Sequence, residues 1–415
     1  MAASIPAAPD DYGPVDDDDE FEVLAGLVSV SFGVATDAVR QWLGPQRADA
    51  RVYRRQGRVL AGLTLLPMGQ FFGGRRVSQC GVAGVAVAPD QRGQGLASAL
   101  MTRTIDELAS ANIALSVLYP ATYPLYRNVG FELAGGHYRV SVPAHRLPAT
   151  PRRPEPSPDQ LDGDPMERDP IEIRPVETSD EAAIRRMYRR CAIHRPGWLD
   201  RSLYIWRRVF QNPGGLPIHS YVAVGERDLE GYVCYRQEPV VGQQQHDLVL
   251  HDLVSTTGPA ARRLLGFLAS HSAQARDVVW YGGVDDPHAY LLPERGPDIR
   301  LVDPWMLRII DVTAALSARG YPSHLSARLD LELTDALVPK NCGRFRLDID
   351  AGRGAVTRGG RGSIALDTAA LATIYSGHMS PYQLASADRL RAPAAALARM
   401  ASAFAGPPPS LPDAF

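Results

Sequence analysis

One stretch, residues 82–100, constrains the fold of this chain more than any other. An apolar run, residues 82–88, is followed by a turn rich in Arg and Gly and then by the start of an amphipathic helix. Such a turn places backbone N–H groups at the positive end of a helix dipole, which favours anions. Gly93 and Gly95 allow an anion to approach the backbone closely. The lysine of a nucleoside-triphosphate loop and the glycine spacing of a dinucleotide fold are both missing, so neither of those ligands is indicated.

The pattern that remains, Arg92-x-x-Gly95-x-Ala97, resembles the pyrophosphate-binding signature of the GNAT acyl-coenzyme A transferases. A second apolar strand at residues 113–119 follows, and then the phrase Tyr126-Arg-Asn-Val-Gly130-Phe131. The order of these elements (strand, phosphate turn, helix, strand and Tyr-x-x-x-Gly-Phe phrase) closely resembles the order found in that family. The alternative for the turn alone is a tight connection that binds nothing.

Length and composition describe an ordinary globular protein of several domains. A chain of 415 residues is too long for one core and suggests two or three domains. Hydrophobic residues make up 45% and charged residues 22%, and the net charge of −2 gives no reason to expect nucleic acid or a membrane as partner. No signal peptide or membrane-length apolar run is seen. The scattered Cys80, Cys191, Cys234 and Cys342 lack metal or redox spacing, which favours buried thiols in the cytoplasm and no metal.

Three further segments organise the chain. Residues 1–20 carry an acidic run and predict a solvated, flexible tail, while residues 143–170 are rich in proline and predict a linker. Residues 247–265 repeat the strand, turn and helix of residues 82–100, which indicates a second copy of the same unit. That copy has Thr256-Thr-Gly258-Pro259 at the turn, and Pro259 lacks an N–H, so we expect it not to hold coenzyme A.

The region beyond Trp305 has an α+β pattern. We predict helices at 312–319, 368–376, 381–387 and 393–404, and strands at 326–333, 343–349, 354–357 and 362–366.

The three-part order resembles the Eis (enhanced intracellular survival) branch of the GNAT superfamily. The matching phrases include Val85-Ala-Val-Ala-Pro89, Trp305-Met-Leu-Arg-Ile-Ile310, Asp388-Arg-Leu-Arg391 and the terminal Phe415. The resemblance implies tandem GNAT-like domains, the first active and the second degenerate, plus a C-terminal α+β domain like sterol carrier protein. With the segments above, this predicts a tail at 1–20, a catalytic domain at 21–142, a linker at 143–170, a degenerate domain at 171–304 and a third domain at 305–415.

The same resemblance implies acetyl transfer from acetyl-coenzyme A to amines of aminoglycoside-like or polyamine substrates, by a hexamer. The implied cofactor-binding residues are Val85, Ala86 and Val87 on the strand and Arg92, Gly93, Gln94, Gly95, Leu96 and Ala97 at the turn. Arg92 would add a charge-assisted contact to the pyrophosphate. The side chains of the strand valines can also be ordinary core residues, and this interpretation is compatible with cofactor binding through their backbone groups.

Tyr126 is the predicted general acid, because a phenol suits a thiolate leaving group better than a carboxylic acid does. Tyr119 and Tyr123 are rivals in the same segment, and a core tyrosine is the structural alternative. By the resemblance, the C-terminal carboxylate of Phe415 reaches the active site and helps to deprotonate the amine. The prolines at 407–409 and 412 stiffen this tail and lower the entropy cost of docking it.

Recognition of a polycationic acceptor needs carboxylates and flat aromatic walls. Candidates are Phe32, Trp42, Trp198, Trp206 and Asp413, and for each of them core packing or surface placement is an alternative at least as strong. A predicted loop at residues 71–76 brings Arg75 and Arg76 toward the acceptor side, which favours a less cationic acceptor. Two other functions stay open: acyl transfer to another acceptor, such as a natural product or protein lysine, or from a longer donor; and lipid or ligand binding with a vestigial transferase.

Overall fold

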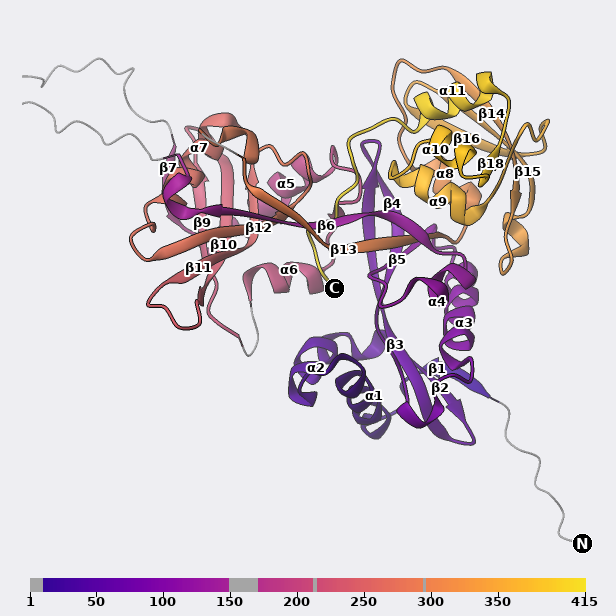
Figure 1. Cartoon of the computed structure of the whole chain (residues 1–415), viewed down its shortest axis with the longest axis horizontal. Helices are drawn as coiled ribbons and strands as arrows, with labels where there is room; N and C mark the ends of the chain where they lie inside the picture. The colour runs from indigo at the N-terminus through magenta and orange to yellow at the C-terminus, as the bar shows by residue number, and fades with distance from the viewer. Residues whose placement is uncertain (1–9, 149–170, 212–214, 294–295) are drawn as a thin grey trace, which may run out of the picture. The chain divides into compact units, whose positions relative to one another are not determined.

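The computed structural model describes residues 10–148, 171–211, 215–293 and 296–415. These form two compact units, each built from separate pieces of the chain (Figure 1). The first combines the described part of Met1–Gly136 with Ile193–Tyr204 and Asp303–Phe415, and the second combines that of His137–Ala192 with Ile205–Val302.

The first unit contains a mixed sheet in the order β1-β2-β3-β4-β5-β13. Its strands are β1 (Asp11–Pro14), β2 (Ala50–Arg55), β3 (Arg58–Phe72), β4 (Arg75–Val87), β5 (Leu115–Leu118) and β13 (Asp298–Ile309). The first residues of β13, up to Val302, belong to the second unit. The pairs are antiparallel except β4 with β5, which run parallel. The short β8 (Leu199–Asp200) pairs with β3.

Helices contribute to two separate hydrophobic clusters around this sheet. Those of the N-terminal half are α1 (Asp18–Phe32), α2 (Thr36–Leu43), α3 (Leu96–Ser110) and α4 (Tyr123–Asn128). One cluster joins Leu24 and Val28 of α1 to Ala86 of β4. The other joins Leu100 of α3 and Tyr126 of α4 to β3, β4 and β5. Because successive strand side chains point to opposite faces, β4 is buried on both sides.

The acidic segment is ordered from Asp10 onward, which corrects the predicted flexible tail for residues 10–20. Residues 11–14 form β1 against β2, and Asp17 caps α1 by accepting a hydrogen bond from Glu20 N at 2.9 Å. Three of its carboxylates, those of Asp11, Asp16 and Glu20, form ion pairs with the buried Arg54. The acidic run therefore begins helix α1 and neutralises Arg54, and it is not a solvated tail. Residues 1–9 lie outside the described part.

The remainder of the first unit is a five-stranded sheet with four helices. Its strand order is β16-β15-β14-β17-β18. The elements are α8 (Val312–Ala318), β14 (Ala327–Thr334), β15 (Gly343–Asp350), β16 (Arg353–Arg358), β17 (Ile364–Asp367), α9 (Thr368–Ser376), α10 (Pro381–Ser386), β18 (Leu390–Arg391) and α11 (Ala394–Ala403). The predicted helices and strands of this region are confirmed to within two residues at each end.

The second unit repeats the plan of the first. Its strands are β6 (Glu132–Pro143), β7 (Glu172–Pro175), β9 (His219–Val224), β10 (Leu229–Pro239), β11 (His246–Ser255) and β12 (Ala275–Gly282), and its helices are α5 (Glu181–Ala192), α6 (Leu203–Phe210) and α7 (Gly258–Ala269). As in β3-β4-β5, an antiparallel pair, β10 with β11, is followed by a parallel pair, β11 with β12, across one helix. The predicted internal repeat is confirmed. Most of the predicted linker, residues 149–170, lies outside the described residues.

Two observations concern membranes and metals. No single helix of the described chain has the length and apolar character of a membrane span, although the bent pair Asp18–Phe32 and Thr36–Asp49 passes that test jointly. Within the same described residues, no group of three or more His, Cys, Asp or Glu side chains is placed to hold a metal ion.

Candidate active site

The central feature of the first unit is a fork between β4 and β5. The two strands pair only through Gln79–Leu115, Cys80–Ser116 and Gly81–Val117. Beyond Gly81, β4 continues to Val87, whereas β5 ends at Leu118. Residues 82–87 therefore have no partner in β5, and an unpaired strand edge can hydrogen-bond an extended ligand.

A bulge reshapes β4 within the fork. The register against β3 shifts between Gly62, opposite Ala86, and Thr64, opposite Ala83. Gly84 lies in the bulge with φ of +63°, a conformation that favours glycine. Val85 and Val87 are half-buried beside the cluster that holds Tyr126, and Ala86 is buried on the opposite face. The bulge thus brings the predicted cofactor valines onto the Tyr126 side.

The turn after β4 leaves the start of α3 open. Gly93 and Gly95 both have φ of +78°, and Gly95 is the N-cap without a side-chain cap. The first intrahelical bond runs from Ala99 N to Gly95 O at 3.0 Å, so the N–H groups before it have no acceptor within the helix. Gln94 and the two glycines are exposed. Arg92 is also exposed, and its Nη2 lies 3.4 Å from Ser31 Oγ.

Leu96 and Ala97 contribute differently from the glycines. The side chain of Leu96 is buried in the core cluster, and Ala97 is half-buried. For Leu96, only the backbone N–H can serve a ligand at the helix start. Its side chain instead anchors α3 to the sheet.

The three tyrosines after β5 have different environments. Tyr126 is 4% exposed beside Phe131, and burial raises its pKa to about 12. The Tyr119 hydroxyl donates to the carbonyl oxygens of Asp413 at 2.8 Å and Leu411 at 3.3 Å. Tyr123 is exposed beneath the Arg127 guanidinium. Tyr119 therefore anchors the C-terminal segment, which leaves Tyr126 as the stronger candidate for the acid.

The C-terminal segment docks at the fork. The Phe415 ring lies 5.6 Å from the Tyr119 ring, centroid to centroid. A Cβ on Gly81 would lie 2.7 Å from Phe415 Cε2, so glycine is needed for this close approach. Gly81 is the last residue of β4 that pairs with β5, and Tyr119 follows the end of β5. The terminal residue is thus placed where the two strands part.

Backbone hydrogen bonds hold this segment just before Phe415. Ser410 N donates to Pro196 O, and Leu411 N donates to Gly136 O, each at 3.1 Å. The indole Nε1 of Trp198 lies 3.3 Å from Ser410 Oγ. Trp198, a predicted substrate residue, is buried and supports the docked tail instead.

A buried ion pair completes the attachment of the tail. Arg201 contacts Asp413 through Nε at 3.0 Å and Nη2 at 2.9 Å, and the side chains are only 1% and 7% exposed. A fork-like contact of this kind combines charge with fixed geometry. Asp413, predicted to bind a cationic substrate, is therefore neutralised by Arg201. Sequence inspection missed Arg201 because no local pattern links it to residue 413.

The other predicted aromatic residues separate into two groups. Phe32 and Trp42 lie edge to face with centroids 6.4 Å apart, and Phe32 is 49% exposed. A Cβ on Gly84 would be 3.7 Å from the Trp42 indole, which places this pair beside the bulge of β4. Trp206 is buried in the second unit against Tyr188 and Phe210. Trp206 is therefore a core residue of the second unit.

The predicted loop at residues 71–76 is mainly strand, which corrects the inference drawn from it. β3 extends to Phe72, and only Gly73 and Gly74 separate it from β4. Phe71 and Phe72 are buried, and Arg76 Nε lies 2.6 Å from Asp200 Oδ2. Arg76 is thus neutralised at the hairpin end of β4, away from residues 82–87. It gives no evidence for or against a cationic acceptor.

The equivalent turn in the second unit differs in that its helix start is capped. The Thr257 hydroxyl caps α7 by accepting from Ala260 N at 3.3 Å, and Pro259 in the first turn has no N–H. The same hydroxyl donates to the Glu230 carboxylate at 2.5 Å. A carboxylate beside a capped helix start disfavours a pyrophosphate through charge repulsion. These contacts support the expectation that only the first copy holds coenzyme A.

Comparison with known proteins agrees with this geometry. The acetyltransferase (GNAT) domain family matches residues 14–134, a second GNAT domain family matches residues 197–309, and the sterol carrier protein domain family matches residues 312–412. The solved structure of a GCN5-related N-acetyltransferase from Anabaena variabilis is 32% identical with a TM-score of 0.89, covering 98% of this chain and 100% of that one.

Two curated proteins extend the comparison. The N-acetyltransferase Eis of Mycobacterium tuberculosis is 27% identical over 79% of this chain and 78% of its own length. An N-acetyltransferase of Streptomyces griseus, itself uncharacterised, is 27% identical over 94% of this chain and 95% of its own length.

The forked sheet and the uncapped start of α3, together with the relatives and the matching domain families, identify an acyl-coenzyme A N-acyltransferase. The chain belongs to the GNAT family, as an Eis-like member with two GNAT domains and a C-terminal sterol-carrier-type domain.

Proposed function

We propose that this enzyme transfers an acetyl group from acetyl-coenzyme A to a primary amine, with aminoglycoside-like compounds or polyamines as the first acceptor class. The observation that carries the proposal is the position of Phe415 at the fork of β4 and β5. It puts a carboxylate-bearing residue beside the strand edge that can hold an acyl donor. The acceptor class rests on the family resemblance.

The residues at the fork and turn fit acetyl-coenzyme A. The uncapped start of α3, with Gly93 and Gly95 in left-handed conformation, suits a pyrophosphate, and Arg92 can add a charge-assisted contact. The unpaired edge of β4 at Val85–Val87 suits the amide groups of a pantetheine arm. When bound, acetyl-coenzyme A supplies an acetyl thioester, whose carbonyl a backbone N–H of this strand can polarise.

Tyr126 acts as the general acid in this proposal. Because its pKa is about 12, the phenol stays protonated through the physiological range. It gives its proton to the sulfur as the carbon–sulfur bond breaks, and it is re-protonated from solvent.

The Phe415 carboxylate acts as the proton acceptor for the amine. The amine nitrogen forms a bond to the acyl carbon and loses one proton through water to this carboxylate. An α-carboxylate has a low reference pKa, so it favours the neutral amine mainly by accepting a hydrogen bond and stabilising positive charge. A semisynthetic protein that ends in the carboxamide of Phe415 tests this role, because it keeps the ring and removes the charge. We expect at least a tenfold loss of kcat, and full activity of the carboxamide would contradict the role.

The direct test of function is thiol release from acetyl-coenzyme A with a panel of amines. The panel contains a kanamycin-like aminoglycoside, spermidine, a lysine peptide and phenylethylamine. Turnover with an aminoglycoside or polyamine is the expected result. Binding of acetyl-coenzyme A without turnover on any amine would contradict the acceptor class, and absence of binding would contradict the transferase proposal itself.

A second acceptor class, amines with an apolar or aromatic body, is favoured by one specific observation. Trp42 lies beside Gly84 and packs edge to face against the half-exposed Phe32, and Val30 and Val34 of the same helical hairpin are also exposed. The predicted acidic contact, Asp413, is occupied by Arg201. Faster turnover of phenylethylamine than of spermidine in the same panel would favour this class, and the reverse order would exclude it.

A further inference from the structure

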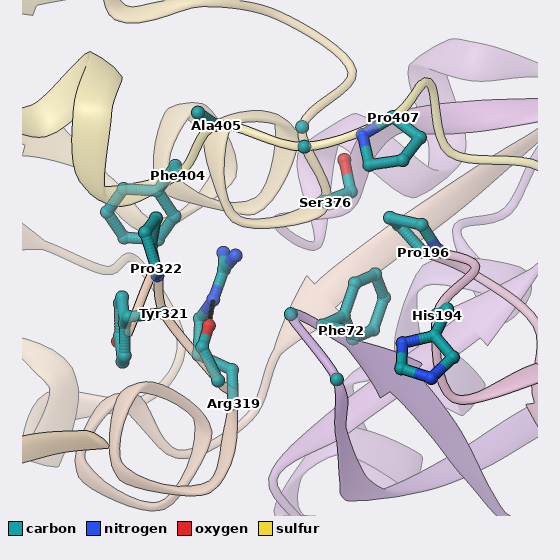
Figure 2. A pocket seen from close by; sticks show the side chains of 15 residues that line it. Phe72, His194, Pro196, Arg319, Tyr321, Pro322, Ser376, Phe404, Ala405 and Pro407 are labelled. Atoms are coloured by element: carbon teal, nitrogen blue, oxygen red, sulfur yellow. Dashed lines mark hydrogen bonds between the residues drawn. The ribbon is translucent and has the colours of Figure 1, made fainter. Parts of the chain in front are cut away.

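A cavity lies in the first unit at the hairpin end of β3 and β4, away from the fork. Its volume is about 280 Å³. The wall is formed by the hairpin tip at Phe72–Gly74, the segment after α8, the end of α9 and the segment after α11, with His194 and Pro196 beside them (Figure 2). Small-ligand sites in proteins typically begin at about 300 Å³, so the space suits a compact molecule.

Arg319 brings a buried positive charge to this cavity. The residue is only 4% exposed, and Figure 2 shows its guanidinium pointing into the space bounded by Phe404 and Ser376. Nε donates to Gly320 O at 3.1 Å, and Nη1 donates to Tyr375 O. Within the described part of the chain, Arg319 has no ion pair with a carboxylate.

Burying the Arg319 guanidinium without a carboxylate partner costs free energy. Burial lowers the pKa of Arg319, but an arginine side chain remains protonated in proteins. Aromatic rings offset part of the cost, since the guanidinium carbon lies 4.5 Å from the Phe404 centroid, 5.0 Å from Tyr375 and 5.2 Å from Tyr321. Ring faces and two carbonyl oxygens stabilise the cation but leave its charge unneutralised.

The other residues around the cavity define what can enter. None of the residues that line it is Asp or Glu, and His194 is the other basic one. The apolar part of the wall consists of Phe72, Tyr321, Phe404, Pro196, Pro322 and Pro407. The wall thus combines one buried cation with flat apolar surfaces.

The wall is held in a fixed arrangement by contact between two glycines. Gly320 N donates to Phe72 O at 3.0 Å. A Cβ on Gly320 would lie 1.8 Å from Gly73 O, and a Cβ on Gly73 would lie 2.1 Å from Gly320 O, so neither position accepts a side chain. The cavity is therefore largely formed before a ligand arrives, which reduces the entropy cost of binding.

We propose that this cavity is a binding site for a small organic carboxylate with an aromatic or compact apolar body. One carboxylate oxygen contacts the guanidinium of Arg319, and the body lies against Phe404 and Pro322. The site is separate from the fork and does not depend on the transferase activity. The small volume distinguishes the ligand from a long-chain lipid.

The test is calorimetric titration of the full chain with benzoate, in the presence of saturating acetyl-coenzyme A. We expect saturable binding of benzoate, and at least tenfold weaker binding of benzamide, which has the same shape without the charge. Absence of benzoate binding, equal affinity for benzamide, or displacement of benzoate by acetyl-coenzyme A would each overturn the proposal. Binding of dodecanoate without benzoate would also overturn it, because that pattern indicates a lipid site.

Two variants locate the site. Ala405→Trp, at an exposed position of the rim, is expected to fill the cavity and abolish benzoate binding while the core is untouched. Arg319→Met is expected to reduce affinity at least tenfold, whereas Arg361→Met, at an exposed arginine of the same α+β region, is the matched control. Wild-type affinity in a folded Ala405→Trp protein would contradict the assignment even if Arg319→Met does not fold.

Discussion

At the scale of single residues, Tyr126 has the environment of a proton donor that does not titrate near neutral pH. It is buried, and its pKa is raised to about 12. The Tyr126→Phe enzyme should lose about 10²-fold or more in kcat while its affinity for acetyl-coenzyme A is unchanged. Stopped assays of thiol release together with equilibrium binding separate the two effects. Tyr123→Phe, at an exposed position, is the control, and an equal loss in both variants would remove Tyr126 as the acid.

The same pKa predicts the form of the pH profile. Tyr126 donates only while protonated, and this form predominates below about pH 12. The plot of kcat against pH should therefore show no decline between pH 8 and 10 from this residue. A decline near pH 10 that disappears in Tyr126→Phe would show that the phenol titrates at its ordinary value.

Arg201 and Asp413 test the attachment of the C-terminal segment. Arg201→Met removes the cation that pairs with the buried Asp413 carboxylate, and breaking a buried ion pair by removing one partner costs about 3–5 kcal/mol. The tail can avoid this cost by leaving the fork, so activity should fall by more than tenfold while the unfolding temperature changes little. Limited carboxypeptidase digestion reports release of the tail.

A matched control for that variant is Arg76→Met, which removes a half-exposed ion pair with Asp200 in the same unit. Exposed pairs contribute about 0–1 kcal/mol, so activity should remain close to that of the parent. A tail that stays protected in Arg201→Met would show that the backbone bonds of Ser410 and Leu411 suffice without the ion pair.

At the scale of elements, the bulge in β4 shapes the strand that we propose holds the pantetheine arm. Gly84→Ala should raise the KM for acetyl-coenzyme A several-fold and destabilise the fold by about 1 kcal/mol. The cause is backbone conformation, because φ is +63° while a Cβ there would meet its neighbours at an ordinary 3.7 Å. Steady-state kinetics and thermal unfolding measure the two effects.

Gly26→Ala is the control for that element, since Gly26 lies within α1 and a Cβ there would meet nothing within 4 Å. It should stabilise the helix by about 0.5–1 kcal/mol and leave the KM unchanged. A Gly84→Ala enzyme with the parent KM would show that the bulge does not position the donor.

Elements also show what sequence patterns could and could not predict. The strand, turn and helix at residues 82–100 and the helices and strands beyond residue 312 follow from local periodicity and turn residues, and the structure has them at nearly the predicted positions. The acidic run at 16–20 was misjudged because its order depends on Arg54, which a local pattern does not reveal. The family resemblance led us to expect Phe415 near the active site, but no local pattern indicated Gly81 or Arg201 as the residues that accommodate and hold the tail, because both are far from it in the chain.

At the scale of the whole molecule, the first unit is assembled from three separate pieces of chain. Its last piece supplies both the docked tail and the end of strand β13, where residues Met306–Ile309 pair with Leu118–Leu115 of β5. β5 is thus an interior strand of the finished sheet that lies early in the sequence.

This arrangement has a consequence for biosynthesis. When β5 emerges from the ribosome, the strand that will cover its outer edge has not yet been translated, and the interval includes all of the second unit. A nascent chain of this kind carries an exposed apolar strand edge for much of its synthesis, which is a hazard for aggregation and a natural target for chaperones. The outer edge of β5 is covered only after translation has passed Ile309, so we expect a product that terminates before this point to expose the edge and to aggregate.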